Sequence, residues 1–334
     1  MLLKKKILVL VFSAWSVAAF SQQKEIQYLS GTDNTHTVSW DFFCTGGRNS
    51  GYWTTIPVPS HWEQQGFGSY NYGRDYKTYG KNYRFADEKG LYKYRFTAPA
   101  AWRNKKVFLV FEGSMTDTDV KLNGKSAGPV HRGAFYRFKY DVTDQIKFGA
   151  GNVLEATVSK MSEDASVNNA ERLADYWVLG GIFRPVYLEA VPKEHIDYIA
   201  IDAKADGSFA LQAFPKGLTS SKTITATIFD AKGKPVGSTS AKASANDSVV
   251  NLQTKLSGVL KWTSETPHLY KVVVSLKDGA KAVYQTSEKF GFRTIEVRHG
   301  DGIYLNGVQI KMKGANRHVW WPETGRCVNP EIDL

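Results

Sequence analysis

Short alternating stretches that end in tight turns are the feature that most constrains the fold of this chain. Tyr92–Phe96 alternates aromatic with charged residues, 106–111 is apolar enough for a buried strand, and Asn123-Gly124 directly follows a third such stretch. Alternation with period two is typical of β-strands, and Asn-Gly favours a hairpin turn because both residues tolerate positive φ. Amphipathic helical patterns longer than about ten residues are absent. The sequence therefore predicts an all-β fold made of sandwiches or barrels.

A change of composition near Val191-Pro192 predicts a domain boundary. From 194 to 296 aromatic residues become rarer, and Ala, Ser, Thr, Lys and Val dominate. Strand patterns recur there at 196–201, 209–214, 223–229, 249–256, 270–276 and 283–290. About seven strands in roughly a hundred residues fit an immunoglobulin-like sandwich, in which Trp262 and Tyr270 are predicted to be core rings.

A third segment begins at Asp301-Gly302. The apolar triplet 303–305 enters a second Asn-Gly turn at Asn306-Gly307, and 309–314 leaves it, so another hairpin is predicted. The residues from there to Leu334 are too few to bury a hydrophobic core of their own. We interpret the segment as the opening of a further domain.

The first 21 residues have the pattern of a secretory signal peptide. Lys4, Lys5 and Lys6 precede an apolar run at 7–20, and small residues near Ser21 offer a cleavage site. A membrane anchor is the alternative, but the run is shorter than the roughly 20 residues that a spanning helix needs. We therefore expect an exported protein, periplasmic or secreted, with no membrane attachment after cleavage.

The distribution of charge bears on the class of partner that the chain binds, and the cysteine content bears on its disulfides. The formal net charge is +11, but Lys and Arg are scattered along the chain after the signal, so no nucleic-acid partner is predicted. Cys44 and Cys327 lie in different predicted domains, and we expect them to be unpaired and buried.

Four stretches, in order, resemble glycoside hydrolase family 2, which contains β-galactosidases, β-glucuronidases and β-mannosidases. They are the "NGK..G" turn at 123–128 with Asp141-Val142-Thr143; the "GGIFRPV" sequence at 180–186; Trp262 to Tyr270 with 290–296; and "GANRH" at 314–318 with Pro322 and Gly325. The similarity covers about residues 40–334. Pro185 stands where members of the family often have Asp. An earlier stretch, Ser60-His61-Trp62, is similar to the family's "PSHW" sequence, and its Trp is expected to anchor the first strand of the first domain.

The resemblance implies a domain order and an activity. It implies a jelly-roll, galactose-binding-like domain at 28–192, an immunoglobulin-like sandwich at 193–297, and the opening hairpin of a (β/α)8 barrel at 298–334. The chain would then be the N-terminal region of a retaining glycosidase, β-galactosidase-like, that cleaves terminal β-glycosidic bonds in carbohydrate metabolism. An exported carbohydrate-binding or complementing protein without catalysis is the alternative, and a structural adhesin fits less well because "GANRH" would have no purpose there.

The resemblance also sets the expected site residues. Retaining enzymes use two carboxyl groups about 5–5.5 Å apart. In the family both belong to glutamates, at positions later than the one that corresponds to Leu334. Glu323 and Glu331 match neither, so no catalytic residue is assigned and the chain is expected to be inactive.

His318, Asn316 and Asp175 are the expected substrate-binding residues, with a carbohydrate as partner. Asp175 aligns with an aspartate that helps to hold a sodium ion in β-galactosidases. The resemblance therefore allows a sodium or magnesium ion near the active site. No other cofactor is predicted, and the sugar and the oligomeric state stay open.

Overall fold

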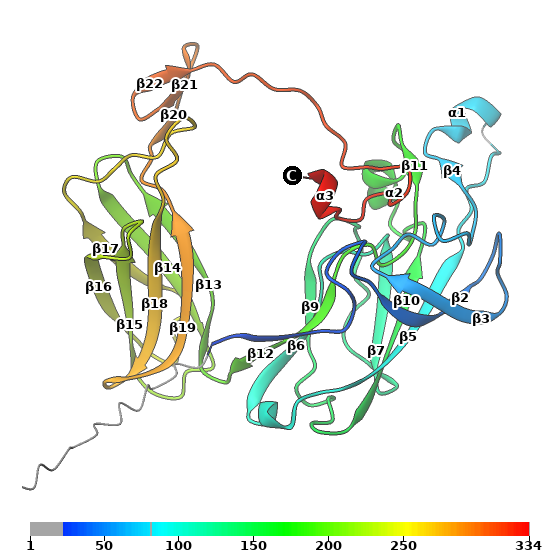
Figure 1. The fold of residues 1–334 in the computed structure, drawn as a ribbon, viewed down its shortest axis with the longest axis horizontal. Coiled ribbons are helices and arrows are strands. Elements are labelled where there is room, and N and C mark those ends of the chain that lie inside the picture. The colour runs from blue at the N-terminus through cyan, green and yellow to red at the C-terminus, as the bar shows by residue number, and fades with distance from the viewer. Residues whose placement is uncertain (1–22, 81, 334) are drawn as a thin grey trace, which may run out of the picture.

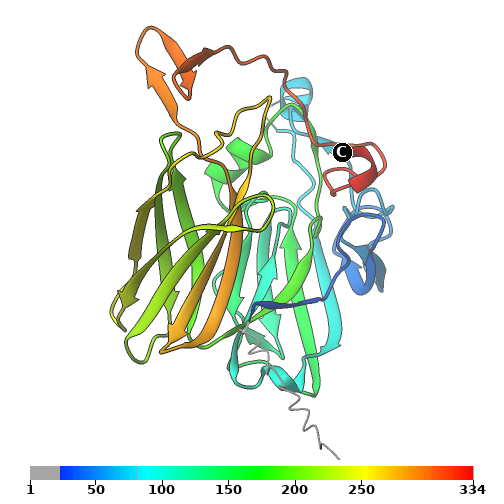
Figure 2. The ribbon, with the colours of Figure 1, turned by 60° about the vertical axis from the view of Figure 1, so that its left-hand side comes forward.

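The computed structural model describes residues 23–80 and 82–333, and almost every regular element in them is a β-strand. Two β-sandwiches stand side by side, and the C-terminal residues run back from the second sandwich to the first (Figures 1 and 2). The longest helix among the described residues, α2, has only seven residues (Ala165–Glu171). The predicted all-β class is confirmed, while the predicted signal peptide at 1–21 lies outside the described residues.

The first sandwich packs a four-stranded sheet, in the order β1-β12-β6-β9, against a six-stranded sheet, in the order β3-β2-β5-β10-β7-β8. All neighbouring strands pair antiparallel, which lets one face of each sheet turn to the core. The bounds are β1 Glu25–Tyr28, β2 Val38–Cys44, β3 Trp53–Val58, β5 Lys89–Thr97, β6 Lys105–Phe111, β7 Asp117–Leu122, β8 Lys125–Ser126, β9 Phe138–Asp141, β10 Gly151–Ser159 and β12 Val186–Pro192. The remaining elements of this domain are β4 Asn71–Tyr72, α1 Asp75–Tyr79, η1 Ala100–Trp102, α2 and β11 Trp177–Val178.

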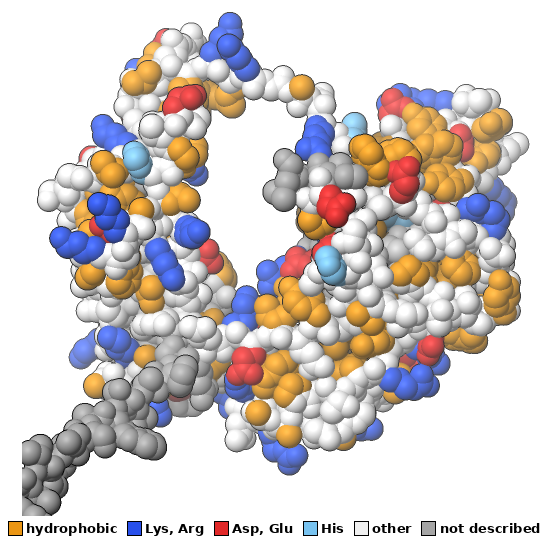
Figure 3. Space-filling model, in the orientation of Figure 1, with side chains coloured by type: hydrophobic (Ala, Val, Ile, Leu, Met, Phe, Trp, Pro, Cys, Tyr) orange, Lys and Arg blue, Asp and Glu red, His pale blue; other side chains and the backbone are white. Residues whose placement is uncertain are grey.

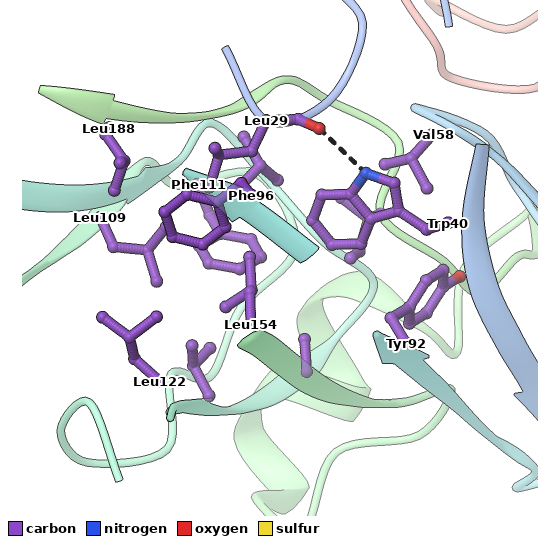
Figure 4. Close-up of a cluster of buried hydrophobic side chains, with 14 of the residues drawn as sticks. Leu29, Trp40, Val58, Tyr92, Phe96, Leu109, Phe111, Leu122, Leu154 and Leu188 are labelled. Atoms are coloured by element: carbon purple, nitrogen blue, oxygen red, sulfur yellow. Dashed lines mark hydrogen bonds between the residues drawn. The ribbon is translucent and has the colours of Figure 1, made fainter. Parts of the chain in front are cut away.

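The core of the first sandwich lies between its two sheets (Figure 4). Leu109 from one sheet and Leu122 and Leu154 from the other are fully buried, because alternate residues of each strand point inward. Trp40 is also buried, and its indole nitrogen donates to the carbonyl oxygen of Leu29 at 3.0 Å. Trp62 is fully buried and packs on Phe42 of β2, the first strand that lies wholly within the predicted domain 28–192, with ring centroids 6.2 Å apart.

The second sandwich has seven strands in two sheets, ordered β13-β14-β17 and β16-β15-β18-β19. Six match the predicted strand patterns, and the seventh, Pro235–Ala243, was missed because its sequence is mostly small and polar. Tyr270 is a core ring as predicted, whereas Trp262 is only partly buried and lies under the Arg293 guanidinium, 4.7 Å from its carbon. The bounds are β13 His195–Ala203, β14 Ser208–Lys216, β15 Lys222–Phe229, β16 Pro235–Ala243, β17 Val250–Lys255, β18 Tyr270–Asp278 and β19 Lys281–Phe290.

The C-terminal part starts with a small sheet of β20 Ile295–Arg298, β21 Gly302–Leu305 and β22 Val308–Ile310, and ends in α3 Pro330–Asp333. Asn306 and Gly307 have φ of 53° and 82°, so the hairpin predicted from Asn-Gly is present. No barrel closes within the part of the chain that the structure describes. Helices long and apolar enough to cross a membrane are missing from that part as well.

Candidate functional site

The short ladder between β4 and β11 brings together two segments that are about a hundred residues apart in sequence. Tyr72 pairs with Trp177, and Asn71 pairs with Val178. The ladder places the rings of Tyr70 and Tyr72 against Trp177, with centroids 5.1 and 5.5 Å away and both contacts edge to face. The Tyr72 hydroxyl donates to Oδ1 of Asp175, which precedes β11. We call Tyr70, Tyr72, Asp175 and Trp177 the aromatic rim.

The aromatic rim presents both apolar surface and a carboxylate to solvent. Trp177 is 41% exposed, Tyr70 is 38% exposed, and Asp175 is exposed. Aromatic rings that lie beside polar groups can bind ligands that have both an apolar face and hydroxyl groups. Carbohydrates are ligands of this kind. Sequence reasoning picked out Asp175 but missed Tyr70 and Tyr72. Their spacing of two, which puts both on one face of a strand, was the available signal.

Asn316 and His318 lie in the exposed segment 311–319 that links β22 to the C-terminal residues. His318 lines a cavity of about 120 Å³ together with Trp320, Trp321 and Thr324. Among the described residues no side-chain hydrogen bond joins Asn316 or His318 to Asp175, so the structure does not assemble the three predicted residues into one cluster.

Residues 320–329, which we call the anchor segment, dock on the first sandwich beside the aromatic rim. The backbone N–H of Arg326 donates to Nε2 of His61 at 3.1 Å, and the guanidinium carbon of Arg326 lies 4.6 Å from the ring centroid of Tyr176, the residue after Asp175. Cys327 is a free, buried thiol that packs with Leu179 and Phe183. Because His318 precedes this segment by two residues, docking holds it on the same side of the sandwich as the rim.

The anchor segment makes further hydrogen bonds to the first sandwich. The N–H of Asn34 donates to the Val328 carbonyl, and Nε2 of Gln64 donates to the Pro322 carbonyl, each at 3.2 Å. Gly325 lies so close to His61 that a Cβ there would be 2.5 Å from its Cδ2. Cys44 is also free and buried, so both thiols are unpaired, as predicted.

His61 is held in one protonation state. Since Nε2 accepts the Arg326 N–H, the proton must be on Nδ1, which donates to the Gly180 carbonyl oxygen at 3.0 Å. The ring is 1% exposed and stacks on Phe183 at 5.2 Å. Burial lowers the pKa of His61 from about 6.5 to about 3. The imidazole is therefore neutral at physiological pH and supports structure rather than proton transfer.

A buried ion cluster supports the same region. Nζ of Lys160 lies 2.9 Å from Oε1 of Glu63 and 3.1 Å from Oε1 of Glu88, and all three side chains are buried. Both carboxylate oxygens of Glu63 also accept the Gly180 N–H, at 3.0 and 3.1 Å. Burial raises the pKa of Glu63 to about 7, although Lys160 opposes the shift. Two carboxylates thus lie close together, but water and substrate cannot reach them.

The described residues near Asp175 do not by themselves fit a metal ion. No group of three or more Asp, Glu, His or Cys side chains that could hold a metal occurs in 23–80 and 82–333. The carboxylate of Asp175 is engaged by the Tyr72 hydroxyl instead.

Comparison with known proteins matches the two sandwiches in order. The family "Glycosyl hydrolases family 2, sugar binding domain" matches residues 12–192, and "Glycosyl hydrolases family 2" matches residues 191–293. The chain is 29% identical over 299 residues to the β-galactosidase of Priestia megaterium, covering 82% of this chain and 28% of that protein. It is 30% identical over 312 residues to the β-galactosidase of Streptococcus thermophilus, covering 89% of this chain and 29% of that protein.

A solved structure has the same fold. The β-glucuronidase of Bacteroides uniformis superposes with a TM-score of 0.72 at 22% identity, covering 93% of this chain and 37% of that one. The chain therefore spans less than two fifths of the length of each of these three proteins.

Proposed function

Because the chain belongs to family 2 of the glycosyl hydrolases, we propose that it is the N-terminal region of a retaining glycosidase that cleaves terminal β-galactosidic bonds. The observation that carries the proposal is the order of the two family domains, at 12–192 and 191–293, in a chain that spans 28% of the Priestia megaterium β-galactosidase. The glycosidase chemistry would belong to the part of the protein that follows.

In this proposal the described residues bind and orient the substrate. The aromatic rim supplies ring surface from Trp177 and a hydroxyl acceptor from Asp175, and His318 and Asn316, which precede the docked anchor segment, would add further contacts to the substrate. Retaining hydrolysis needs two accessible carboxyl groups about 5–5.5 Å apart. The carboxylates of Glu63 and Glu88 do not meet this need, since both are buried against Lys160.

The proposal includes export to the periplasm or the medium. The charged and apolar pattern of residues 1–21 supports it, because that pattern is typical of a secretory signal peptide. The exposed aromatic rings of the rim also favour the second candidate, a carbohydrate-binding protein that does not itself catalyse.

The first test is to assay the purified 334-residue protein with the p-nitrophenyl β-galactoside, β-glucuronide and β-mannoside. We expect no release of nitrophenol above the blank, because retaining hydrolysis needs two accessible carboxyl groups and the paired carboxylates of Glu63 and Glu88 are buried against Lys160. Turnover that disappears on substitution of a carboxyl residue within this chain would contradict the non-catalytic role.

The second test is to read the coding DNA beyond codon 334 and to express the whole frame. If the frame continues, we expect β-galactoside hydrolysis with retention, seen by NMR as the first-formed anomer, and Asp175→Asn should lower kcat/KM while exposed Tyr136→Ala should not. If the frame stops, the glycosidase proposal fails and the carbohydrate-binding candidate replaces it.

A further inference from the structure

The two sandwiches meet along a cleft of about 470 Å³ at the joint where β12 passes into β13. In Figure 1 the strand β12, which leads into this joint, lies at the opposite end of the first sandwich from β4 and β11, which carry the aromatic rim. Its walls come from both domains, with Lys139 of β9 and Glu189 of β12 facing Tyr198 of β13 and Tyr284 of β19. We propose that this joint cleft is a second binding site, that its ligand is a neutral saccharide, and that it is independent of any glycosidase pocket.

The cleft carries equal numbers of positive and negative side chains. Lys24, Arg137 and Lys139 line it together with Glu189, Asp197 and Glu288. Nζ of Lys139 lies 2.8 Å from Oδ1 of Asp197, and Figure 3 shows blue and red side chains close together where the two domains join. A charge-balanced lining gives no advantage to a ligand with net charge. It offers donors and acceptors side by side, which suits hydroxyl groups because each can both donate and accept.

Glu189 has unused hydrogen-bonding capacity inside the cleft. Its side chain is only 7% exposed, yet its Oε2 makes no hydrogen bond to any described residue. Nζ of Lys24 and Nη2 of Arg137 lie 3.3 and 3.5 Å from this oxygen, longer than the roughly 2.7–2.9 Å of a charge-assisted hydrogen bond. The two ion pairs offset part of the cost of burying this carboxylate, and Oε2 can still accept a hydrogen bond. A ligand hydroxyl in the cleft would donate to it without breaking either ion pair.

Tyr198 supplies a fixed aromatic surface on the second-domain wall. Its ring stacks on Phe214 of the neighbouring strand, with centroids 4.0 Å apart and planes 14° from parallel, but it remains 54% exposed. The stack covers one face of the ring, and the exposed side chain also lines the cleft. The apolar face of a pyranose ring packs well on such a surface.

The size and the position of the cleft fit a small ligand. Ligand sites usually measure about 300–1,000 Å³ and occur preferentially at domain interfaces. The cleft is large enough for a disaccharide, and a bound sugar would touch both sandwiches. Binding there would also restrain the joint between the domains, because its contacts come from β9 and β12 on one side and β13 and β19 on the other.

The test is calorimetric titration of the purified chain with lactose and, separately, with cellobiose. We expect measurable binding of at least one of them, and weaker binding of sodium glucuronate because the cleft carries no excess positive charge. Tyr198→Ala should weaken binding about tenfold through loss of the stacked ring, while Tyr198→Phe should bind like the wild type. Tyr198 is exposed, so both variants are expected to fold.

Two control variants separate this site from the proposed function. Trp177→Ala removes the central ring of the aromatic rim and so reports any saccharide bound there, whereas Tyr136→Ala removes an exposed tyrosine with no assigned role and should leave the titration unchanged. The proposal is overturned if neither disaccharide binds, or if glucuronate binds more tightly than both. It is also overturned if Tyr198→Ala binds normally, if Tyr198→Phe loses binding, or if Trp177→Ala abolishes disaccharide binding. The last result would place the sugar at the rim, whereas the nitrophenyl assay has no bearing on the joint cleft.

Discussion

His61 joins two distant parts of the chain through its two ring nitrogens. One nitrogen donates to Gly180 within the first sandwich, and the other accepts from Arg326 in the anchor segment. Protonation would turn the acceptor nitrogen into a donor facing an N–H group, and the folded state therefore resists it, in line with the depressed pKa of about 3.

This predicts an acid-sensitive stability that His61→Gln should reduce. Between about pH 6.5 and pH 3 an unfolded His61 binds a proton and a folded one does not, so its contribution is complete above pH 6.5 and is lost as pH falls. The slope is at most about 1.4 kcal/mol per pH unit. The stability gap between wild type and His61→Gln, from urea unfolding at pH 7.5, 5.5 and 4.5, should shrink toward acid. A gap that stays constant would contradict this, and exposed His268→Gln serves as the control with a wild-type profile.

Lys160 neutralises two buried carboxylates, so its removal should lower the free energy of unfolding. Lys160→Met leaves Glu63 and Glu88 without their shared cation, and we expect a loss of about 3–5 kcal/mol in the free energy of unfolding at pH 8. Arg95→Met is the matched control, because its ion pair with Asp41 is 71% and 47% exposed and should contribute less than about 1 kcal/mol. Equal losses in the two variants, measured by urea denaturation, would argue against a stabilising ion cluster.

At the level of elements, the local sequence predicts the turns better than it predicts which distant segments pair with each other. The two Asn-Gly turns have the positive φ that their sequences demand, and most strands follow their alternating patterns. The strand 235–243 escaped prediction because alternation among Gly, Ser, Thr and Ala carries little hydrophobic contrast. The ladder of β4 with β11 has only two residues in each strand and exists because the surrounding loops pack together.

Gly325 tests the docking of the anchor segment. Gly325→Ala should push that segment off His61, since the new Cβ would lie 2.5 Å from His61 Cδ2, and should speed hydrogen exchange at the Arg326 amide. Gly258→Ala is the matched control, with a similar φ (+68° against +60°) and nothing within 4 Å of the new Cβ. Unchanged protection of the Arg326 amide in Gly325→Ala would show that the segment does not depend on this contact.

On the scale of the whole molecule, the two sandwiches have separate hydrophobic cores. Each core lies mainly between its own pair of sheets, and the polar joint cleft lies between the domains, although Val191 of β12 and Phe108 of β6 also pack with the second core. The domains should therefore unfold as two cooperative units rather than one.

Paired core substitutions would check this independence. Leu154→Ala should lower the stability of the first sandwich alone, and Leu252→Ala that of the second alone, each by about 2–5 kcal/mol through loss of buried contacts. Differential scanning calorimetry should show one transition shifted in each variant. A single transition that moves equally in both would mean that the domains unfold together.

The all-β class, the two Asn-Gly hairpins and the membership of family 2 could be predicted from the sequence, because strands, turns and family signatures depend on residues that are near one another in the chain. The contacts between distant polar groups could not be predicted from the sequence, because they follow from the tertiary fold. Lys160 reaches Glu63, Tyr72 reaches Asp175 and Arg326 reaches His61 across 97, 103 and 265 residues respectively. Such contacts depend on burial that the finished fold creates, since removal from water sets both the cost of a charge and the strength of its partner.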